Sequence, residues 1–240
     1  MPNEYVLVHG ACHGAWCWDE VAARLLAKGH RVVTLDLPGH GRRAAEVRRA
    51  SVLAYGRAVA DAMALEGISR GVLVGHSMAG LVIPKAAELV PSRIAHLVFL
   101  AAVVVPDGGS LARTLMAPAG RAMVLGNAAG RGDGTFLYPA ETAWARWMGD
   151  MPRSDPRVWR AISLLTPQAL RPFVELVDLR VFYGMRVPRT YIRCLEDKAV
   201  VPTKAAECAT RLDVTPVDMD CAHNAMLSRP DELVRILESV

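Results

Sequence analysis

The chain has 240 residues, of which 52% are hydrophobic and 22% are charged, and its formal net charge is +4. This length and composition are typical of one globular domain that buries a full core. The mild positive charge does not form the basic stripe of a nucleic-acid-binding protein, because its densest cluster, residues 42–49, holds Glu46 among its arginines. We interpret that cluster as a solvated helix or loop face and expect no nucleic-acid partner.

Membrane and metal partners are not expected either. The longest apolar run, residues 97–105, is shorter than the roughly 20 residues that span a bilayer. No leader pattern is recognisable, so we expect a soluble, cytoplasmic protein. The five cysteines are odd in number and include no Cys-x-x-Cys pair, which argues against a disulfide framework and a structural zinc. The sequence leaves open whether the protein is a monomer or a homodimer.

Short apolar, β-branched runs alternate with helical patterns along the chain. Strands are predicted at residues 5–8, 31–35, 71–74, 96–104, 189–194 and 214–219. Helices are predicted at residues 18–28, 54–66, 78–89, 203–211 and 231–237. Continuous apolar strands separated by helices indicate a mostly parallel sheet that is covered on both faces, so the fold class is α/β with three layers.

Residues 106–188 interrupt this alternation. They contain no convincing strand, many Pro and Gly residues, and Trp144, Trp147 and Trp159. An insertion of this length between strands is usually functional. We therefore predict a largely helical cap over the carboxyl end of the sheet, with residues 1–105 and 189–240 as the core. A purely structural helical excursion is the alternative.

The segment VLVGHSMAG, which begins at Val72, carries the strongest chemical signal. A buried strand runs directly into a helix with Ser77 at the junction, as in a nucleophile elbow. The sharp turn needs small neighbours. Gly75 fits the usual Gly-x-Ser-x-Gly pattern, whereas Ala79 replaces the second glycine and Gly80 follows it. The helix amino end offers N–H groups that favour an oxyanion. The alternative is a serine that merely caps a helix.

A serine nucleophile needs a neutral imidazole to take its proton. In chains with this elbow, the acid and then the histidine follow the serine. His223 lies after the last predicted strand and is the predicted base, whereas His96 begins a strand and is interpreted as structural. The carboxylate that orients the imidazole is expected after the preceding strand, where spacing alone leaves both Glu196 and Asp197 open. Weaker candidates, within or beside the last strand, are Asp213, Asp218 and Asp220.

The first strand leads into a loop that begins at His9. A loop of this type supplies one of the two oxyanion N–H groups. We predict that the donors are the backbone amides of Ala11 and Met78. His9 and His13 could be catalytic, but such residues more often brace the loop through hydrogen bonds, which is the interpretation preferred here.

Several segments resemble the plant methylesterase and hydroxynitrile lyase branch of the α/β-hydrolases, together with its bacterial relatives. They are VLVHGACHGAWCW from Val6, GHSMAGLVIPKAAE from Gly75, CLEDKAVVP from Cys194 and CAHNAMLSRPDEL from Cys221. LLTPQAL from Leu164 resembles the late cap segment of the same branch. Together these segments span nearly the whole chain.

The resemblance implies an α/β-hydrolase fold with six strands, no cofactor, and a small apolar pocket beneath the cap. It also selects Asp197 as the acid and implies hydrolysis of small methyl or aryl-acid esters. The lyase members carry a Lys after the catalytic His and a Thr in the first loop, where this chain has Asn224 and Gly10. Both departures argue against a cyanohydrin lyase. Ala79 departs from most of the family and leaves the substrate shape open.

The leading hypothesis is a serine esterase for a small, largely apolar carboxylic ester, with Ser77, His223 and Asp197 as its triad. An alternative on the same fold is a cofactor-free lyase, acyl-transfer or cyclisation enzyme of small-molecule biosynthesis. A less favoured one is a ligand-binding receptor with an unused triad. The only expected partner is a small-molecule substrate. Its predicted pocket residues are Gly10, Trp144, Trp147 and Asn224.

Overall fold

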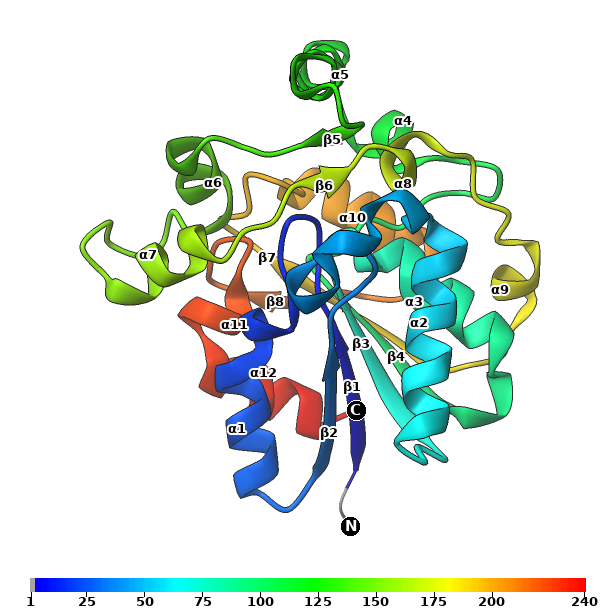
Figure 1. The fold of residues 1–240 in the computed structure, drawn as a ribbon. Helices are drawn as coiled ribbons and strands as arrows, with labels where there is room; N and C mark the ends of the chain where they lie inside the picture. The colour runs from blue at the N-terminus through cyan, green and yellow to red at the C-terminus, as the bar shows by residue number, and fades with distance from the viewer. Residues whose placement is uncertain (1–2) are drawn as a thin grey trace.

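The computed structural model describes residues 3–240, with a six-stranded parallel sheet at its centre (Figure 1). The strands are β1 (Glu4–Val8), β2 (Arg31–Leu35), β3 (Gly71–His76), β4 (Ile94–Leu100), β7 (Arg189–Cys194) and β8 (Val217–Met219). Their order across the sheet is β2-β1-β3-β4-β7-β8. The predicted α/β class and the six strands are confirmed, although β8 begins three residues later than expected and β4 ends earlier, where Ala101 turns the chain with a φ of 44°.

Helices cover both faces of the sheet, as predicted. One face carries α1 (Asp19–Ala27), α12 (Pro230–Glu238) and the short α11 (Ala225–Ser228). The other carries α2 (Val52–Leu65), α3 (Ala79–Leu89) and α10 (Pro202–Arg211). Side chains of a strand point alternately to opposite faces. Accordingly, Tyr5 and Leu7 pack in one core cluster and Val6 and Val8 in the other, all of them fully buried.

The segment between β4 and β7 lies over the carboxyl ends of the strands (Figure 1). Its helices are α4 (Leu111–Leu115), α5 (Pro118–Arg131), α6 (Ala140–Trp147), α7 (Pro156–Ser163), α8 (Arg171–Val174) and α9 (Arg180–Gly184). It also holds one antiparallel pair, β5 (Thr135–Phe136) with β6 (Gln168–Ala169). The sequence did not predict this pair, because strands of two residues are too short to leave an alternating pattern.

A buried glutamine in β6 joins this segment to the first loop. The side-chain oxygen of Gln168 accepts hydrogen bonds from the backbone N–H of Cys12 (3.3 Å) and from Nε2 of His40 (2.9 Å). In the same region the N–H of Thr166 donates to the carbonyl of Cys12 at 2.9 Å. The loop after β1 is therefore fixed by the segment between β4 and β7 as well as by the sheet.

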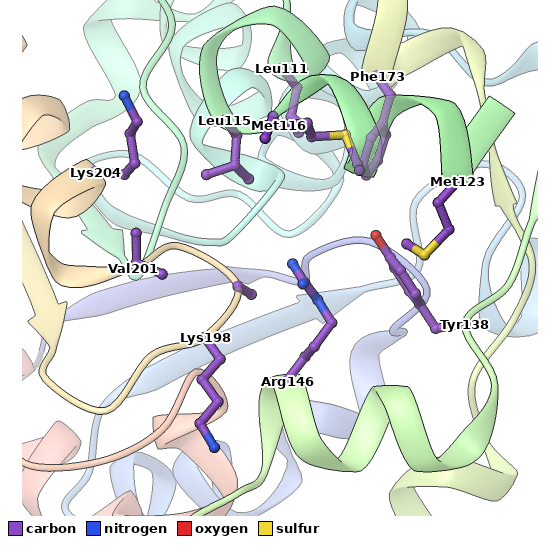
Figure 2. A pocket seen from close by; sticks show the side chains of 13 residues that line it. Leu111, Leu115, Met116, Met123, Tyr138, Arg146, Phe173, Lys198, Val201 and Lys204 are labelled. Atoms are coloured by element: carbon purple, nitrogen blue, oxygen red, sulfur yellow. The ribbon is translucent and has the colours of Figure 1, made fainter.

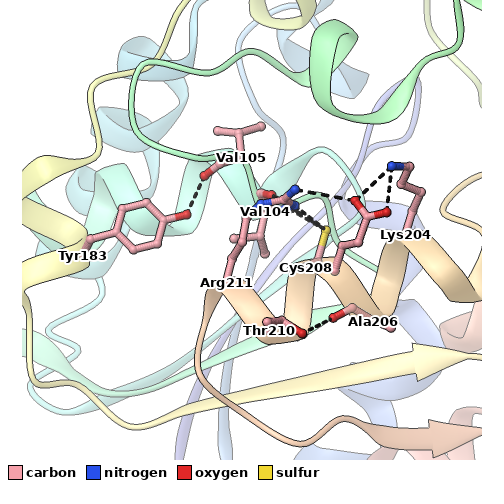
Figure 3. A network of polar contacts seen from close by, with 9 residues as sticks. Val104, Val105, Tyr183, Lys204, Ala206, Cys208, Thr210 and Arg211 are labelled. Carbon is pink, nitrogen blue, oxygen red and sulfur yellow. Dashed lines mark hydrogen bonds and ion pairs between the residues drawn. The ribbon is translucent and has the colours of Figure 1, made fainter.

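The chain that leaves β4 toward the cap is also anchored (Figure 3). Arg211 of α10 donates to the carbonyl of Val104 at 3.1 Å, and the hydroxyl of Tyr183 donates to the carbonyl of Val105. These bonds hold the backbone just after Val103, whose side chain lines the cavity described below.

The arginine-rich residues 42–49 lie in a 3₁₀ segment, Gly41–Arg49, that buries none of its residues. Arg43 pairs with Glu46 at 2.7 Å, and the side chains of Arg42 and Arg49 are 89% and 80% exposed. The prediction of a solvated face is confirmed.

Candidate active site

Ser77 lies where β3 turns into α3, and its backbone φ is 56°. A positive φ is unfavourable for a residue with a Cβ and is retained mainly where the surrounding structure enforces it, often at functional sites. Here the N–H of Ser77 donates to the carbonyl of Leu100 at 3.1 Å. Its carbonyl accepts from the N–H groups of Val103 (3.0 Å) and Gly80 (3.1 Å). These bonds hold the strained turn.

The small residues around Ser77 show where this turn needs space. A Cβ on Gly75 would lie 2.9 Å from Cγ2 of Ile83, and a Cβ on Gly80 would lie 2.3 Å from the carbonyl oxygen of Val103. Ala79, in contrast, fits its fully buried position. In the Gly-x-Ser-x-Gly pattern the second glycine would stand at position 79. In this chain the position that has no room for a Cβ is Gly80, one residue later.

His223 and Asp197 form a buried pair at the ends of β8 and β7. Nδ1 of His223 lies 2.7 Å from Oδ2 of Asp197, and both side chains are 1% exposed. The other carboxylate oxygen accepts from the backbone N–H groups of Ala199 (2.6 Å) and Val200 (2.9 Å). Because a carboxylate only accepts, Nδ1 of His223 carries the proton and Nε2 is left as the basic nitrogen. Glu196, which spacing could not separate from Asp197, is exposed.

His13 braces the first loop. Its Nδ1 donates to the carbonyl of Ala11 at 2.7 Å, so its Nε2 is the acceptor for the amide of Asn224 at 3.1 Å. Burial lowers the pKa of His13 to about 4, and this side chain is therefore neutral near pH 7. The structure thus assigns Asn224, which immediately follows His223, to supporting the loop.

His9 and His76 are buried braces of the same kind. Nδ1 of His9 donates to the carbonyl of Gly10 (2.8 Å), and its Nε2 accepts from a backbone N–H at 3.0 Å. Nε2 of His76 donates to the carbonyl of His223 at 3.1 Å. Burial lowers the pKa of both far below the usual range, so neither adds positive charge beside His223. The predicted bracing role of the first-loop histidines is confirmed. His96 donates to or accepts from the hydroxyl of Thr190, far from this site.

Ala11 and Met78 line the same cavity as Ser77 and His223. Within residues 3–240, neither backbone N–H has an intramolecular acceptor. Gly10 precedes Ala11 and packs closely against the turn at Ser77, because a Cβ on Gly10 would lie only 2.8 Å from Cβ of Ser77. The two amides are therefore available to a ligand oxygen, as an oxyanion hole requires.

The cavity at Ser77 has a volume of about 40 Å³ and opens beside a wider one of about 250 Å³. Core residues form one side of the inner cavity. Its other side comes from the cap, through Leu111, Leu115, Tyr138, Arg146, Trp147 and Phe173. All of these except Trp147 also line the outer cavity, which Figure 2 shows.

Three of the four predicted pocket residues do not line either cavity. Trp147 does. Trp144, one turn earlier on α6, instead donates its indole N–H to the carbonyl of Met151 and stacks with Arg153. Gly10 is covered by Ser77, and Asn224 is engaged with His13.

Residues 5–236 match the profile of the alpha/beta hydrolase family. The chain belongs to this family. Esterase PIR7B of Oryza sativa subsp. japonica is 43% identical over 105 residues, which cover 42% of this chain. The matches to the rice esterases span only 39–44% of those proteins. Methylesterase 9 of Arabidopsis thaliana is 28% identical over 252 residues, which cover 96% of this chain and 95% of the relative.

Solved structures show the same α/β-hydrolase architecture. An extracellular α/β-hydrolase from a Paenibacillus species, described as sharing structural and functional homology with tobacco salicylic acid binding protein 2, has a TM-score of 0.89 at 23% identity. That match covers 99% of this chain and 98% of the other. Polyneuridine aldehyde esterase has a TM-score of 0.78 at 25% identity over 100% and 99% of the two chains. The resemblance to the plant methylesterase branch is confirmed, and the homologues are esterases and methylesterases.

The cap residues of this α/β-hydrolase site were not found from the sequence. Leu115, Tyr138, Arg146 and Phe173 come from separate elements and carry no shared spacing or motif. Among residues 3–240, no group of three or more His, Cys, Asp or Glu side chains is arranged to hold a metal ion. In the same range, no helix combines the length and apolar character needed to cross a bilayer.

Proposed function

We propose that this α/β-hydrolase cleaves a carboxylic ester through an acyl-enzyme on Ser77. The observation that carries the proposal is the buried hydrogen bond between Nδ1 of His223 and Asp197, which leaves Nε2 basic in the cavity that also contains Ser77. The esterases and methylesterases among the relatives support the same chemistry.

In the first half-reaction, Oγ of Ser77 attacks the ester carbonyl carbon while Nε2 of His223 takes its proton. The backbone N–H groups of Ala11 and Met78 donate to the resulting oxyanion. Collapse of the tetrahedral intermediate breaks the bond to the alcohol, which leaves with the proton from His223. Asp197 stays ionised throughout and stabilises the imidazolium.

In the second half-reaction, water attacks the acyl-enzyme and gives its proton to His223. The second tetrahedral intermediate releases the acid and returns the proton to Oγ of Ser77. His13 and His76 assist by remaining neutral, because a second positive charge near His223 would disfavour its protonation. Every proton is moved by these side chains and water, so the proposal requires no cofactor.

The cavity sizes favour a small leaving alcohol. The inner cavity of about 40 Å³ has room for a few heavy atoms, since about 10–15 Å³ of such volume holds one water. The outer cavity of about 250 Å³, lined by leucine, methionine and phenylalanine side chains, suits the larger acid portion. Esters of a small alcohol with an acid that carries an apolar chain are therefore the proposed substrates.

The test is turnover of p-nitrophenyl acetate and short methyl esters by the intact protein and Ser77→Ala. Loss of a triad member typically lowers the rate by about 10⁴ or more, and we expect that loss here. Ser163→Ala removes an exposed hydroxyl that bonds only its own helix, and it should leave turnover unchanged. A Ser77→Ala protein that remains folded and turns over at the original rate would contradict the proposal.

A further inference from the structure

The outer cavity has an unusual charge for a site that is otherwise apolar. It is lined by three basic side chains, Arg146, Lys198 and Lys204, and by no acidic one. Figure 2 shows that these three side chains differ in direction. The guanidinium of Arg146 points into the cavity toward Leu115 and Met116, whereas the ammonium groups of Lys198 and Lys204 point away from it.

The partners of the three cations differ as well. Lys204 forms an ion pair with Glu207 at 2.8 Å, and Lys198 is exposed to solvent. Arg146 has no carboxylate within ion-pair distance in the part of the chain that the structure describes. Its Nε atom is buried and has no hydrogen-bond acceptor. The guanidinium carbon lies over the ring face of Tyr138, 5.7 Å from the ring centroid.

A buried guanidinium nitrogen is normally hydrogen-bonded, and a planar guanidinium binds a carboxylate through two parallel N–H···O bonds. The ring face of Tyr138, with its centroid 5.7 Å from the guanidinium carbon, does not supply such an acceptor. The apolar neighbours Leu115, Met116 and Phe173 lower the local dielectric and strengthen any ion pair formed there. Arg146 also lines the inner cavity that contains Ser77, so one small molecule could contact both residues.

We propose that Arg146 binds a carboxylate carried by the acid portion of the ester, so that the preferred substrates are monoesters of dicarboxylic acids with a small alcohol. This inference rests on the proposed function and specifies its substrate class. The alkoxy group occupies the inner cavity, the apolar chain of the acid contacts Leu115 and Phe173, and the distal carboxylate pairs with Arg146. Arg146 is then a specificity-determining residue, with no part in bond cleavage.

The experiment compares hydrolysis of monomethyl adipate and dimethyl adipate, which differ in the distal charge and one methyl group. We expect the intact protein to favour the monoester in kcat/KM by about tenfold or more, as charge-assisted hydrogen bonds allow. Arg146→Met should abolish this preference, mainly by raising KM for the monoester. Arg146→Lys should restore part of the preference, because it keeps the charge but loses the paired geometry.

Lys198→Met is the matched control, because it removes a cation of the same cavity whose ammonium points elsewhere. It should leave the monoester preference within about twofold of the original, since an exposed charge contributes little. An equal loss in Lys198→Met and Arg146→Met would overturn the assignment to Arg146. So would a wild-type preference for the diester, or a monoester preference that survives Arg146→Met.

A binding measurement separates this inference from the proposed function. Monomethyl adipate is titrated calorimetrically into Ser77→Ala and into Ser77→Ala with Arg146→Met. Tighter binding to the first protein by about tenfold or more supports the anion site even if neither ester is hydrolysed by the intact enzyme. Equal affinity in the two proteins would overturn it, whatever the catalytic activity.

Discussion

The cavity at Ser77 has two walls that differ in what they contribute. The core wall is built from the ends of β1, β3, β4, β7 and β8, and most of its polar side chains have hydrogen-bond partners, such as His13 with Asn224 and His223 with Asp197. The cap wall comes from α4, α6, α8 and the loops between them. It presents apolar side chains together with Arg146, whose buried Nε lacks an acceptor.

This difference separates chemistry from recognition. Strand ends in a rigid sheet hold reacting groups in fixed positions, whereas an insertion can change its side chains without disturbing the sheet. We therefore expect substitutions in the core wall to alter kcat or stability and substitutions in the cap wall to alter KM and substrate preference. The following experiments test that division.

The largest effect is expected for Asp197→Asn. An amide opposite His223 would donate to Nδ1 and so place the imidazole proton on Nε2, which could no longer accept the proton of Ser77. We expect kcat for p-nitrophenyl acetate to fall by about 10⁴. Glu196→Gln alters the exposed neighbouring carboxylate and should have no effect. A loss of less than about tenfold in Asp197→Asn would place the orienting acid elsewhere.

Acid should destabilise the folded protein through its buried histidines. Burial lowers the pKa of His9, His13, His40 and His76, and no histidine lies in residues 106–188. Below the ordinary histidine pKa of about 6.5, the unfolded chain binds protons that the native protein does not, so stability falls as pH decreases. For His13 this window runs from 6.5 to about 4. Each such histidine contributes about 1.4 kcal/mol per pH unit there.

Urea unfolding at pH 7.5, 6.0 and 5.0 would measure this dependence. We expect the free energy of unfolding to drop by several kcal/mol as the pH falls over this range. Its slope against pH should correspond to the uptake of more than one proton on unfolding. His13→Gln should reduce the slope by about one proton. A free energy that is independent of pH between 7.5 and 5.0 would show that these histidines are protonated in the native state.

Gly10→Ala tests the spacing between the first loop and the elbow. The added Cβ would lie 2.8 Å from Cβ of Ser77 and 3.0 Å from Nδ1 of His76, so the loop that carries the Ala11 amide must move. A displacement of this size in a reacting site lowers rates by about 10². Gly126→Ala is a control for glycine replacement, because this residue lies inside α5 and nothing lies within 4 Å of its added Cβ. An unchanged kcat in Gly10→Ala would mean that the loop position does not limit the reaction.

The smallest effect is expected in the cap wall. Leu115→Ala removes apolar contact area from both cavities and should raise KM for dimethyl adipate several-fold, with kcat changed by less than about twofold. Leu125→Ala removes a leucine of α5 that is 48% exposed and lines neither cavity, and it should leave both constants unchanged. A large fall in kcat for Leu115→Ala would break the division between the two walls.

The sequence predicted the sheet mainly through its central strands β1 and β3, which are buried on both faces and therefore read as apolar runs, a signal that depends only on local composition. It also predicted the junction at Ser77 and the position of His223 after the last strand, since strand-to-helix turns and chain order can be read directly from the sequence. Spacing could not separate Glu196 from Asp197. The fold does so, because one is exposed and the other is buried against His223.

Only the tertiary structure decided which cap residues meet the site. Trp144 and Trp147 lie on one helix with similar chemistry, yet only Trp147 turns into the cavity, where its ring packs 5.0 Å from that of His13. Arg146 lies between them and carries no motif. The ring of Trp147 contacts His13, more than a hundred residues away along the chain, and such a contact leaves no period or spacing in the sequence of the cap itself.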